Sequence, residues 1–321
     1  MFVIAGVLLF YSCKKEPADN TNTTPNAVET KILVAGYLPS YGFSRFDMEN
    51  LKYLNRVYYF ALTPTSTGLF QIVGTDTVNL QLLRSKLTSK QELFVTLGGW
   101  TGSQYFHVVA KSAAKREAYA QALLQYCKQY KVDGVDLDFE DYPSTVVDST
   151  YYAFCKDLSS VLHPEGILFT TALGVQKAAK ATHVIDYVDQ INVMSYGKMD
   201  GLGGHSTMDQ LRTYLKDYSL QGLPNNKLIF GVPFYGKRGT ITGDTSALTI
   251  TYSDIVNAIH PASDINKYGA YSFNGKDLIT QKTDTLMQAG YKGIMAWELS
   301  QDCSVTSEYS LLKAMYNRAI K

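Results

Sequence analysis

Cysteine, net charge and nucleotide-binding glycine motifs are scarce in this chain, and each shortage argues against a class of protein. The 4 Cys among 321 residues form no Cys-x-x-Cys pair and no Cys/His cluster, so we expect no metal site. A formal net charge of +1 offers no basic surface to nucleic acid, so we expect no nucleic-acid partner. No Gly-x-Gly-x-x-Gly follows an early apolar segment, and we therefore expect no dinucleotide cofactor, nor any other cofactor.

Tyrosine is abundant instead, with 24 Tyr against 2 Trp. A tyrosine ring combines an apolar face with a hydroxyl at its rim, which suits contact with sugars as well as ordinary core packing. Hydrophobic residues make up 45% of the chain, which is ample for a sizeable core.

The N-terminus begins with an apolar run, MFVIAGVLLFYS, that is too short to span a bilayer and is placed like the core of a signal peptide. Cys13 follows it, and residues 14–30 have the Pro, Asn and Thr content of a flexible tether. This arrangement resembles a bacterial lipoprotein signal over residues 1–13, with Cys13 as the lipid anchor. The resemblance implies export to the cell envelope and membrane contact only through the lipid. A buried N-terminal strand is the alternative, which the tether disfavours.

Short apolar segments alternate with helix-like segments from residue 31 onward, and most are rich in Val, Ile, Leu and Phe. This composition is typical of parallel strands that are buried on both faces. The predicted strands are residues 31–38, 55–62, 92–99, 132–140, 167–173, 189–196, 227–234 and 292–299.

Helical spacing appears between these segments. Tyr119, Leu123, Tyr126 and Tyr130 recur at steps of three and four residues, and amphipathic patterns also follow Ser206 and cover the C-terminus. Eight strands with intervening helices predict one (β/α)8 barrel domain over residues 31–321, which we expect to be a monomer. A doubly wound open sheet is the alternative.

The segment VDGVDLDFE (132–140) alternates apolar and acidic residues from its fourth position onward. Asp136, Asp138 and Glu140 would therefore share one face of a strand. An edge strand with a solvated acidic face is one interpretation. In a barrel, the acids would point into the lumen, where carboxylates are costly unless they are paired, protonated or catalytic. Glu140 falls at the carboxyl end of the strand, where barrel active sites lie, so we favour the catalytic interpretation.

This segment is similar to the fourth-strand signature of glycoside hydrolase family 18, the chitinase family, which reads Asp-x-x-Asp-x-Asp-x-Glu. Asp133, Asp136, Asp138 and Glu140 match it. The resemblance extends in order over nearly all of the chain after the tether. It includes LGGW (97–100), QINVMSY (190–196), KLIFGVPFYG (227–236) and GIMAWELSQD (293–302).

Two acids on one strand cannot easily stand on opposite sides of a glycosidic bond, as the two carboxylates of ordinary glycosidases do. Either the nucleophile lies elsewhere or the substrate supplies it. The resemblance implies that the 2-acetamido oxygen of an N-acetylglucosamine unit attacks its own anomeric carbon. It makes Glu140 the general acid, with a raised pKa, and Asp138 the residue that orients the acetamide. Asp136 would share a proton with Asp138, and Asp133 would be structural.

The resemblance also assigns aromatic residues at other strand ends. Tyr196 would contact the acetamide oxygen, and Trp297 would stack beneath the sugar at the cleavage site. Met194 would shape the pocket, and His205 and Asp209 would lie on loop and helix surfaces. Further candidates, which sugar contact or lumen packing would explain equally well, are Tyr37, Phe60, Trp100 and Tyr235.

Three features depart from the chitinase pattern. Gly197 stands where chitinases usually have Asp after the sixth-strand Tyr, and Asp141 is interposed between the acid and Tyr142. The segment between the last two strands is too short for a large α+β insertion, which predicts a shallow, open cleft. We therefore expect an endo-acting hydrolase of β-1,4-linked N-acetylglucosamine polymers. The alternatives are an endo-β-N-acetylglucosaminidase acting on the chitobiose core of N-glycans and a non-catalytic binding protein.

Overall fold

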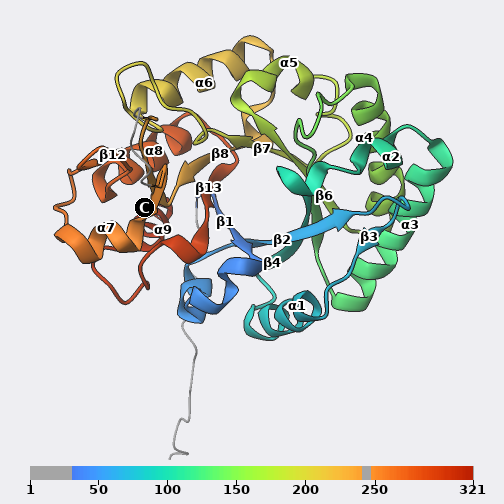
Figure 1. Cartoon of the computed structure of the whole chain (residues 1–321), viewed down its shortest axis with the longest axis horizontal. Helices are drawn as coiled ribbons and strands as arrows, with labels where there is room; N and C mark the ends of the chain where they lie inside the picture. Colours follow the sequence, from blue (N-terminus) through green and yellow to red (C-terminus); the bar gives the residue numbers. More distant parts are fainter. Residues whose placement is uncertain (1–30, 241–246, 321) are drawn as a thin grey trace, which may run out of the picture.

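The computed structural model describes residues 31–240 and 247–320, which form a closed parallel barrel surrounded by helices (Figure 1). Neighbouring barrel strands pair in the order β1-β13-β8-β7-β6-β5-β4-β2, and parallel pairing of β1 with β2 closes the ring. The eight predicted strands are confirmed within a few residues. They are β1 (Leu33–Pro39), β2 (Arg56–Pro64), β4 (Glu92–Gly98), β5 (Gly134–Asp138), β6 (Leu168–Gly174), β7 (Gln190–Met194), β8 (Leu228–Pro233) and β13 (Gly293–Trp297).

Helices cover the outside of the barrel, and the three that the sequence predicted are present. Ser112 caps α3, and Thr207 forms a capping box with Gln210 at the start of α6. The described helices are α1 (Gly74–Lys86), α2 (Phe106–Ala110), α3 (Ala113–Tyr130), α4 (Asp148–Leu162), α5 (Ala178–Ala181), α6 (Met208–Leu220), α7 (Tyr252–Ile259), α8 (Lys276–Gln288) and α9 (Leu311–Ala319). None of these described helices is long and apolar enough to cross a membrane.

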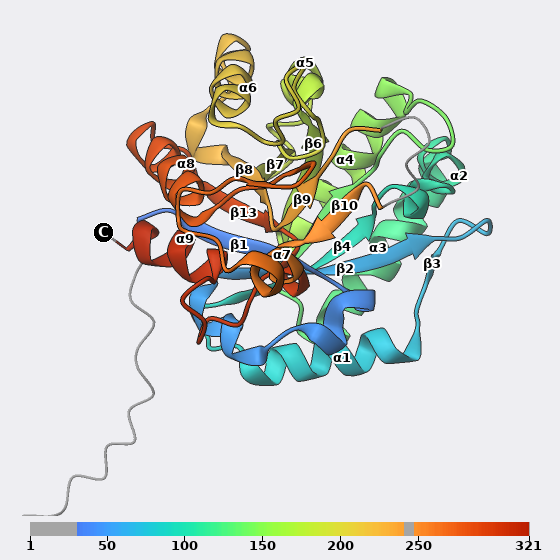
Figure 2. The ribbon, with the colours of Figure 1, turned by 60° about the vertical axis from the view of Figure 1, so that its left-hand side comes forward.

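A compact insertion lies between β8 and β13, consistent with the short segment there. It contains α7 and a small antiparallel sheet in the order β10-β9-β12-β11, which the sequence did not predict (Figure 2). Its strands are β9 (Tyr235–Lys237), β10 (Thr249–Thr251), β11 (Lys267–Tyr268) and β12 (Tyr271–Ser272). A further two-residue strand, β3 (Phe70–Gln71), pairs with the end of β2.

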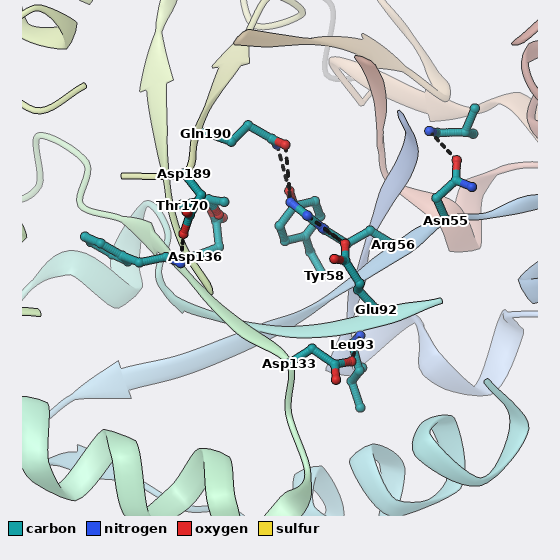
Figure 3. Close-up of polar contacts among 12 residues, drawn as sticks. Asn55, Arg56, Tyr58, Glu92, Leu93, Asp133, Asp136, Thr170, Asp189 and Gln190 are labelled. Atoms are coloured by element: carbon teal, nitrogen blue, oxygen red, sulfur yellow. Dashed lines mark hydrogen bonds and ion pairs between the residues drawn. The ribbon is translucent and has the colours of Figure 1, made fainter. Parts of the chain in front are cut away.

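The amino-terminal part of the lumen is filled by a bonded polar layer (Figure 3). Arg56 forms an ion pair of 2.6 Å with Glu92, lies 4.0 Å from the centre of the Phe94 ring and donates to Gln190. Asp133 lies outside this layer, where its carboxylate accepts bonds of 2.7 Å from Leu93 N and from Arg84. Such contacts at the start of the strand are structural ones, as the sequence suggested for Asp133.

Gly98 sets the path of the chain at the carboxyl end of β4, beside the acidic strand. Its φ is +94°, and a Cβ there would lie 2.5 Å from the carbonyl oxygen of Asp138 and 2.4 Å from the Phe106 ring. Gly99 N donates to the same Asp138 oxygen at 2.8 Å. Both the backbone conformation and the close approach therefore require glycine.

Gly98→Ala should cost about 3 kcal/mol or more of folding free energy, because strained backbone and steric overlap add together. Gly166→Ala is the matched control: its φ is +73°, and a Cβ there would meet nothing within 4 Å. The control should cost only about 1–2 kcal/mol. Urea unfolding of both variants measures the difference, and equal stabilities would contradict the steric account.

Candidate active site

The acidic residues of β5 lie inside the barrel. Asp136 is 0% exposed and Asp138 3%, while the alternate residues Val135 and Leu137 pack into the core between barrel and helices. β5 is paired on both sides, by β4 and by β6. The interpretation of this segment as an edge strand with a solvated acidic face is therefore wrong.

Asp136 is the most fully bonded of the three acids. Its carboxylate accepts hydrogen bonds from Tyr37 OH at 2.8 Å, Thr170 Oγ1 at 2.6 Å and Asn192 Nδ2 at 3.0 Å. Burial raises the pKa of Asp136 to about 6, and the bonds from Thr170 and Tyr37 oppose that rise. The donors stabilise a negative charge deep in the lumen.

Asp138 lies two residues nearer the open end of the barrel than Asp136 and has fewer hydrogen bonds. Its Oδ1 is buried with no hydrogen-bond partner among the described residues. Burial, followed by the neighbouring charges of Glu140 and Asp136, raises the pKa of Asp138 well above its ordinary value. Asp136 accepts its hydrogen bonds from Tyr37, Thr170 and Asn192, and the described contacts contain no bond that would carry a proton shared by the two aspartates.

Glu140 follows the end of β5 and is half-buried. Its backbone N–H donates to Ser103 Oγ at 2.9 Å, which fixes the chain at the point where the side chain turns into the cleft. Burial, with a second contribution from Asp141, raises the pKa of Glu140 to about 7. A carboxyl group with this pKa can hold a proton near neutral pH and release it.

Two cavities meet at Glu140 and Trp297. One, of about 330 Å³, is also lined by Asp138, Met194 and Tyr196, together with Tyr235. The other, of about 780 Å³, extends past Phe60 and Trp100. Because Glu140 and Trp297 line both cavities, a groove runs past the acid on either side and could hold a chain of several sugar units.

Trp297 forms the centre of the groove. Its ring stacks parallel to Tyr196, with 6.2 Å between centroids, and meets Phe60 edge-on at 5.2 Å. Trp100 is 58% exposed on the cleft surface, and its ring lies 5.5 Å from that of Tyr142. Five of the predicted aromatic residues line the two cavities, where a sugar could reach them: Phe60, Trp100, Tyr196, Tyr235 and Trp297.

Tyr37 differs from that expectation. It is 1% exposed, its ring lies 5.4 Å from Trp297, and its hydroxyl is committed to Asp136. A bound sugar could not reach it directly in this arrangement. Tyr37 therefore belongs to the packing and hydrogen-bonding of the lumen, the alternative that the sequence left open.

Gly197 and Asp141, which depart from the chitinase pattern, both have a local structural explanation. A Cβ at Gly197 would meet nothing within 4 Å, so the missing side chain leaves open space in the wall. Asp141 forms an ion pair of 2.8 Å with Lys177 and accepts a bond from Val146 N at 2.7 Å. It thereby anchors the chain after the acid, while Tyr142 packs beside Trp100.

The prediction for His205 was wrong, whereas Asp209 does lie on the surface of α6. His205 is 1% exposed, and its Nε2 forms a short hydrogen bond to the carbonyl oxygen of Tyr196. Its ring also packs against Tyr235, with 5.0 Å between centroids. No local pattern around His205 signals burial, because Ser272, Asn274 and Tyr235, which hold its backbone and ring, lie in elements far along the chain.

The part of the chain that the structure describes contains no group of three or more His, Cys, Asp and Glu side chains arranged to hold a metal ion. Cys127 and Cys155 are buried free thiols, and Cys13 lies outside the described residues. A separate cavity of about 820 Å³ lies at the opposite, amino-terminal end of the barrel, near Lys31 and Glu92.

Comparison with known proteins agrees with a sugar-cleaving class of enzyme. A model of the family described as "Glycosyl hydrolases family 18" matches residues 33–302. Because this match covers most of the chain, the chain belongs to glycosyl hydrolase family 18 and is a hydrolase by family.

The chain is similar to several curated chitinases. Chitinase 1 of Aphanocladium album is 26% identical over 295 residues, covering 71% of this chain and 66% of that protein. Chitinase A1 of Niallia circulans is 26% identical over 304 residues, covering 72% of this chain and 44% of that protein. The chain thus spans about two thirds of the first relative and less than half of the second.

Solved structures confirm the fold. A family 18 chitinase from the chitin utilization locus of Flavobacterium johnsoniae superposes with a TM-score of 0.79 at 24% identity, covering 91% of this chain and 94% of that one. A chitinase from Bacteroides thetaiotaomicron gives a TM-score of 0.76 at 22% identity, covering 90% and 96%. At these identities the likeness establishes the barrel architecture.

Asp141→Asn should lower the pKa of Glu140, because it removes a neighbouring negative charge that favours the protonated acid. A ¹³C NMR titration of the Glu140 carboxyl group measures the change. Asp209→Asn, on a side chain that is 90% exposed, is the control and should leave that pKa unchanged. An unchanged or higher pKa in Asp141→Asn would contradict the electrostatic account.

Proposed function

We propose that the protein is a retaining endo-hydrolase of β-1,4 linkages between N-acetylglucosamine units, as in chitin and chitooligosaccharides. One observation carries this proposal. Among the described residues, the only carboxylates that line the two cavities meeting at Glu140 and Trp297 are Asp138 and Glu140 itself, both at the end of β5. A smaller cavity beside Glu140 adds only Asp141, the next residue along the chain, which is paired with Lys177. The rest of the groove presents aromatic, apolar and neutral polar side chains and one cation, Lys198, so no second carboxylate stands across it.

This arrangement favours a nucleophile that the substrate brings. The acetamido oxygen of the sugar attacks its anomeric carbon as Glu140 donates its proton to the departing glycosidic oxygen, giving a cyclic oxazolinium ion and a free hydroxyl on the leaving sugar. Glu140, now a carboxylate, takes a proton from water, which attacks the anomeric carbon and reopens the ring. Two inversions give net retention. Family 18 enzymes are a known exception to catalysis by two opposed carboxylates.

Asp138 is placed to act on the acetamide. Its unpaired buried oxygen can accept the amide N–H, which orients the group and stabilises the positive charge that develops on it. The Tyr196 hydroxyl lies in the same electrostatic environment, since the charges of Asp138 and Glu140 both raise its pKa in addition to burial. We assign it the acetamide oxygen, and we assign Trp297 the apolar face of the sugar.

The shape of the groove supports cleavage within a chain. Because cavities extend on both sides of Glu140, sugar units can occupy both sides of the scissile bond. The similarity of the chain to Chitinase 1 and Chitinase A1 supports the same substrate class.

Glu140→Gln should lower kcat on chitohexaose by about 10²–10⁴-fold, because the amide cannot donate the required proton. Reducing-end assays and product chromatography measure the loss, and cellohexaose, which lacks the acetamide, should not be cleaved by the wild type. Undiminished activity in Glu140→Gln would show that another group is the acid.

A second candidate is an endo-β-N-acetylglucosaminidase that cuts the chitobiose core of N-glycans. The open space at Gly197 favours it, because a branched substrate needs room beside the cleavage site. A side-by-side assay on chitohexaose and a high-mannose glycoprotein decides between the two. Activity on neither substrate would favour the non-catalytic binding protein, against which the retained acid Glu140 argues.

We also propose export and attachment to a bacterial membrane through a lipid on Cys13, although residues 1–13 lie outside the described residues. The apolar run, the cysteine and the polar tether support this proposal. In a bacterial host, the wild type should incorporate labelled palmitate and sediment with membranes. Cys13→Ala should do neither; equal labelling of both would contradict the assignment.

A further inference from the structure

A lysine without an ionic partner is buried behind the wall of the groove. Lys282 of α8 is 1% exposed, and the described residues offer it no carboxylate within ion-pair distance. It donates instead to neutral oxygens: the carbonyl of Ser206 in a short bond, Ser206 Oγ at 2.8 Å and Asn274 Oδ1 at 2.6 Å. Burial lowers the pKa of Lys282 to about 7. Burying an ammonium group in this way is costly, so its contacts call for an explanation.

The contacts of Lys282 fix an otherwise irregular segment. Residues 196–207 contain no helix or strand, apart from a bridge between Met199 and His205. Ser206 lies within this segment at a φ of +50°, a conformation that costs energy for any residue with a side chain. Asn274, held by Lys282, donates to the carbonyl oxygens of His205 at 3.1 Å and Ser206 at 3.2 Å.

This fixed segment in turn holds the backbone on both sides of Tyr196. Ser206 Oγ donates to the carbonyl oxygen of Ser195 at 3.1 Å, and His205 Nε2 bonds to the carbonyl oxygen of Tyr196. The Tyr235 hydroxyl donates to the same Tyr196 oxygen at 3.1 Å. Both peptide groups that flank Tyr196 are therefore restrained by the segment that Lys282 anchors.

The ring of Tyr196 has little freedom to move independently of its backbone. A Cβ at Gly231 would lie 2.3 Å from Tyr196 Cε1, so the ring rests directly on the β8 backbone, and its other neighbour is Trp297. A small shift of the peptide groups would therefore be passed directly to the hydroxyl in the groove.

We propose that Lys282, Ser206 and His205 form a positioning relay that holds the Tyr196 hydroxyl in place for the acetamide of the substrate. The effect of this relay on catalysis rests on the proposed function. The geometry of the relay does not rest on it, because the relay fixes the position of Tyr196 whether or not a substrate is turned over. The three residues touch neither substrate nor reacting atoms and act only through Tyr196.

A double-mutant cycle tests the relay. Lys282→Met should lower kcat on chitohexaose by about tenfold or more, because misplacement of a contacting group by a fraction of an ångström to an ångström has effects of this size. In the Tyr196→Phe background, Lys282→Met should cause no further loss in kcat. An equal loss in both backgrounds would overturn the proposal, because Lys282 would then act by another route.

Two controls separate positioning from general stability. Thr283→Val changes the neighbouring buried residue of α8, whose hydroxyl bonds only within the helix to Ile279, and should leave kcat unchanged. His205→Gln keeps a donor near the position of Nε2 and should retain far more activity than His205→Leu. If Lys282→Met does not fold, this His205 pair carries the same test, and equal activity of the pair would overturn the proposal.

The crystal structure of Lys282→Met gives a measurement that needs no turnover. A displaced or disordered Tyr196 supports the relay, and an unmoved Tyr196 with intact contacts to Ser206 and His205 overturns it. If the wild type cleaves no N-acetylglucosamine substrate, the proposed function fails while this structural result still decides the relay.

Discussion

Keeping a carboxylate charged inside a closed barrel is the constraint on which the rest of this site depends. The donors to Asp136 come from three different strands: Tyr37 from β1, Thr170 from β6 and Asn192 from β7. They meet only when the ring of strands is closed. Removing water from a carboxylate is costly, and these short bonds from neutral groups offset that cost. The buried acid and the barrel thus stabilise each other.

The environment of the acids changes along β5 toward the open end. Asp136 has all its bonds within the protein, Asp138 has an oxygen with none, and Glu140 is half-buried at the junction of two cavities. This series separates the roles of three chemically similar groups. The deepest holds charge, the middle one has capacity left for a ligand, and the outermost can exchange protons with solvent.

Much of the fold could be predicted from the sequence because strong local periodicity produced it. Most barrel strands are apolar runs of ordinary length, and the alternation in VDGVDLDFE placed the acids on one face. The small sheet β10-β9-β12-β11 could not be predicted, since strands of two or three residues have no recognisable period.

Parts of the site also escaped prediction, for a different reason. His205 is held by Ser272 and Asn274, which lie 67 and 69 residues further along the chain, and the neighbouring Ser206 is held by Lys282, 76 residues further along. Tyr37 lies out of reach of a sugar because its hydroxyl is bonded to Asp136, deep in the lumen. Such contacts between distant elements leave no local signal in a single sequence, whereas the alternating acids of one strand do.

The central claim is that the amide oxygen of the sugar, and not a carboxylate, attacks the anomeric carbon. Aryl chitobiosides whose N-acetyl group carries zero, one, two or three fluorine atoms test it most directly, because fluorine weakens the oxygen as a nucleophile. The account predicts that kcat/KM falls steeply with each fluorine. Rates that stay constant across the series would contradict it.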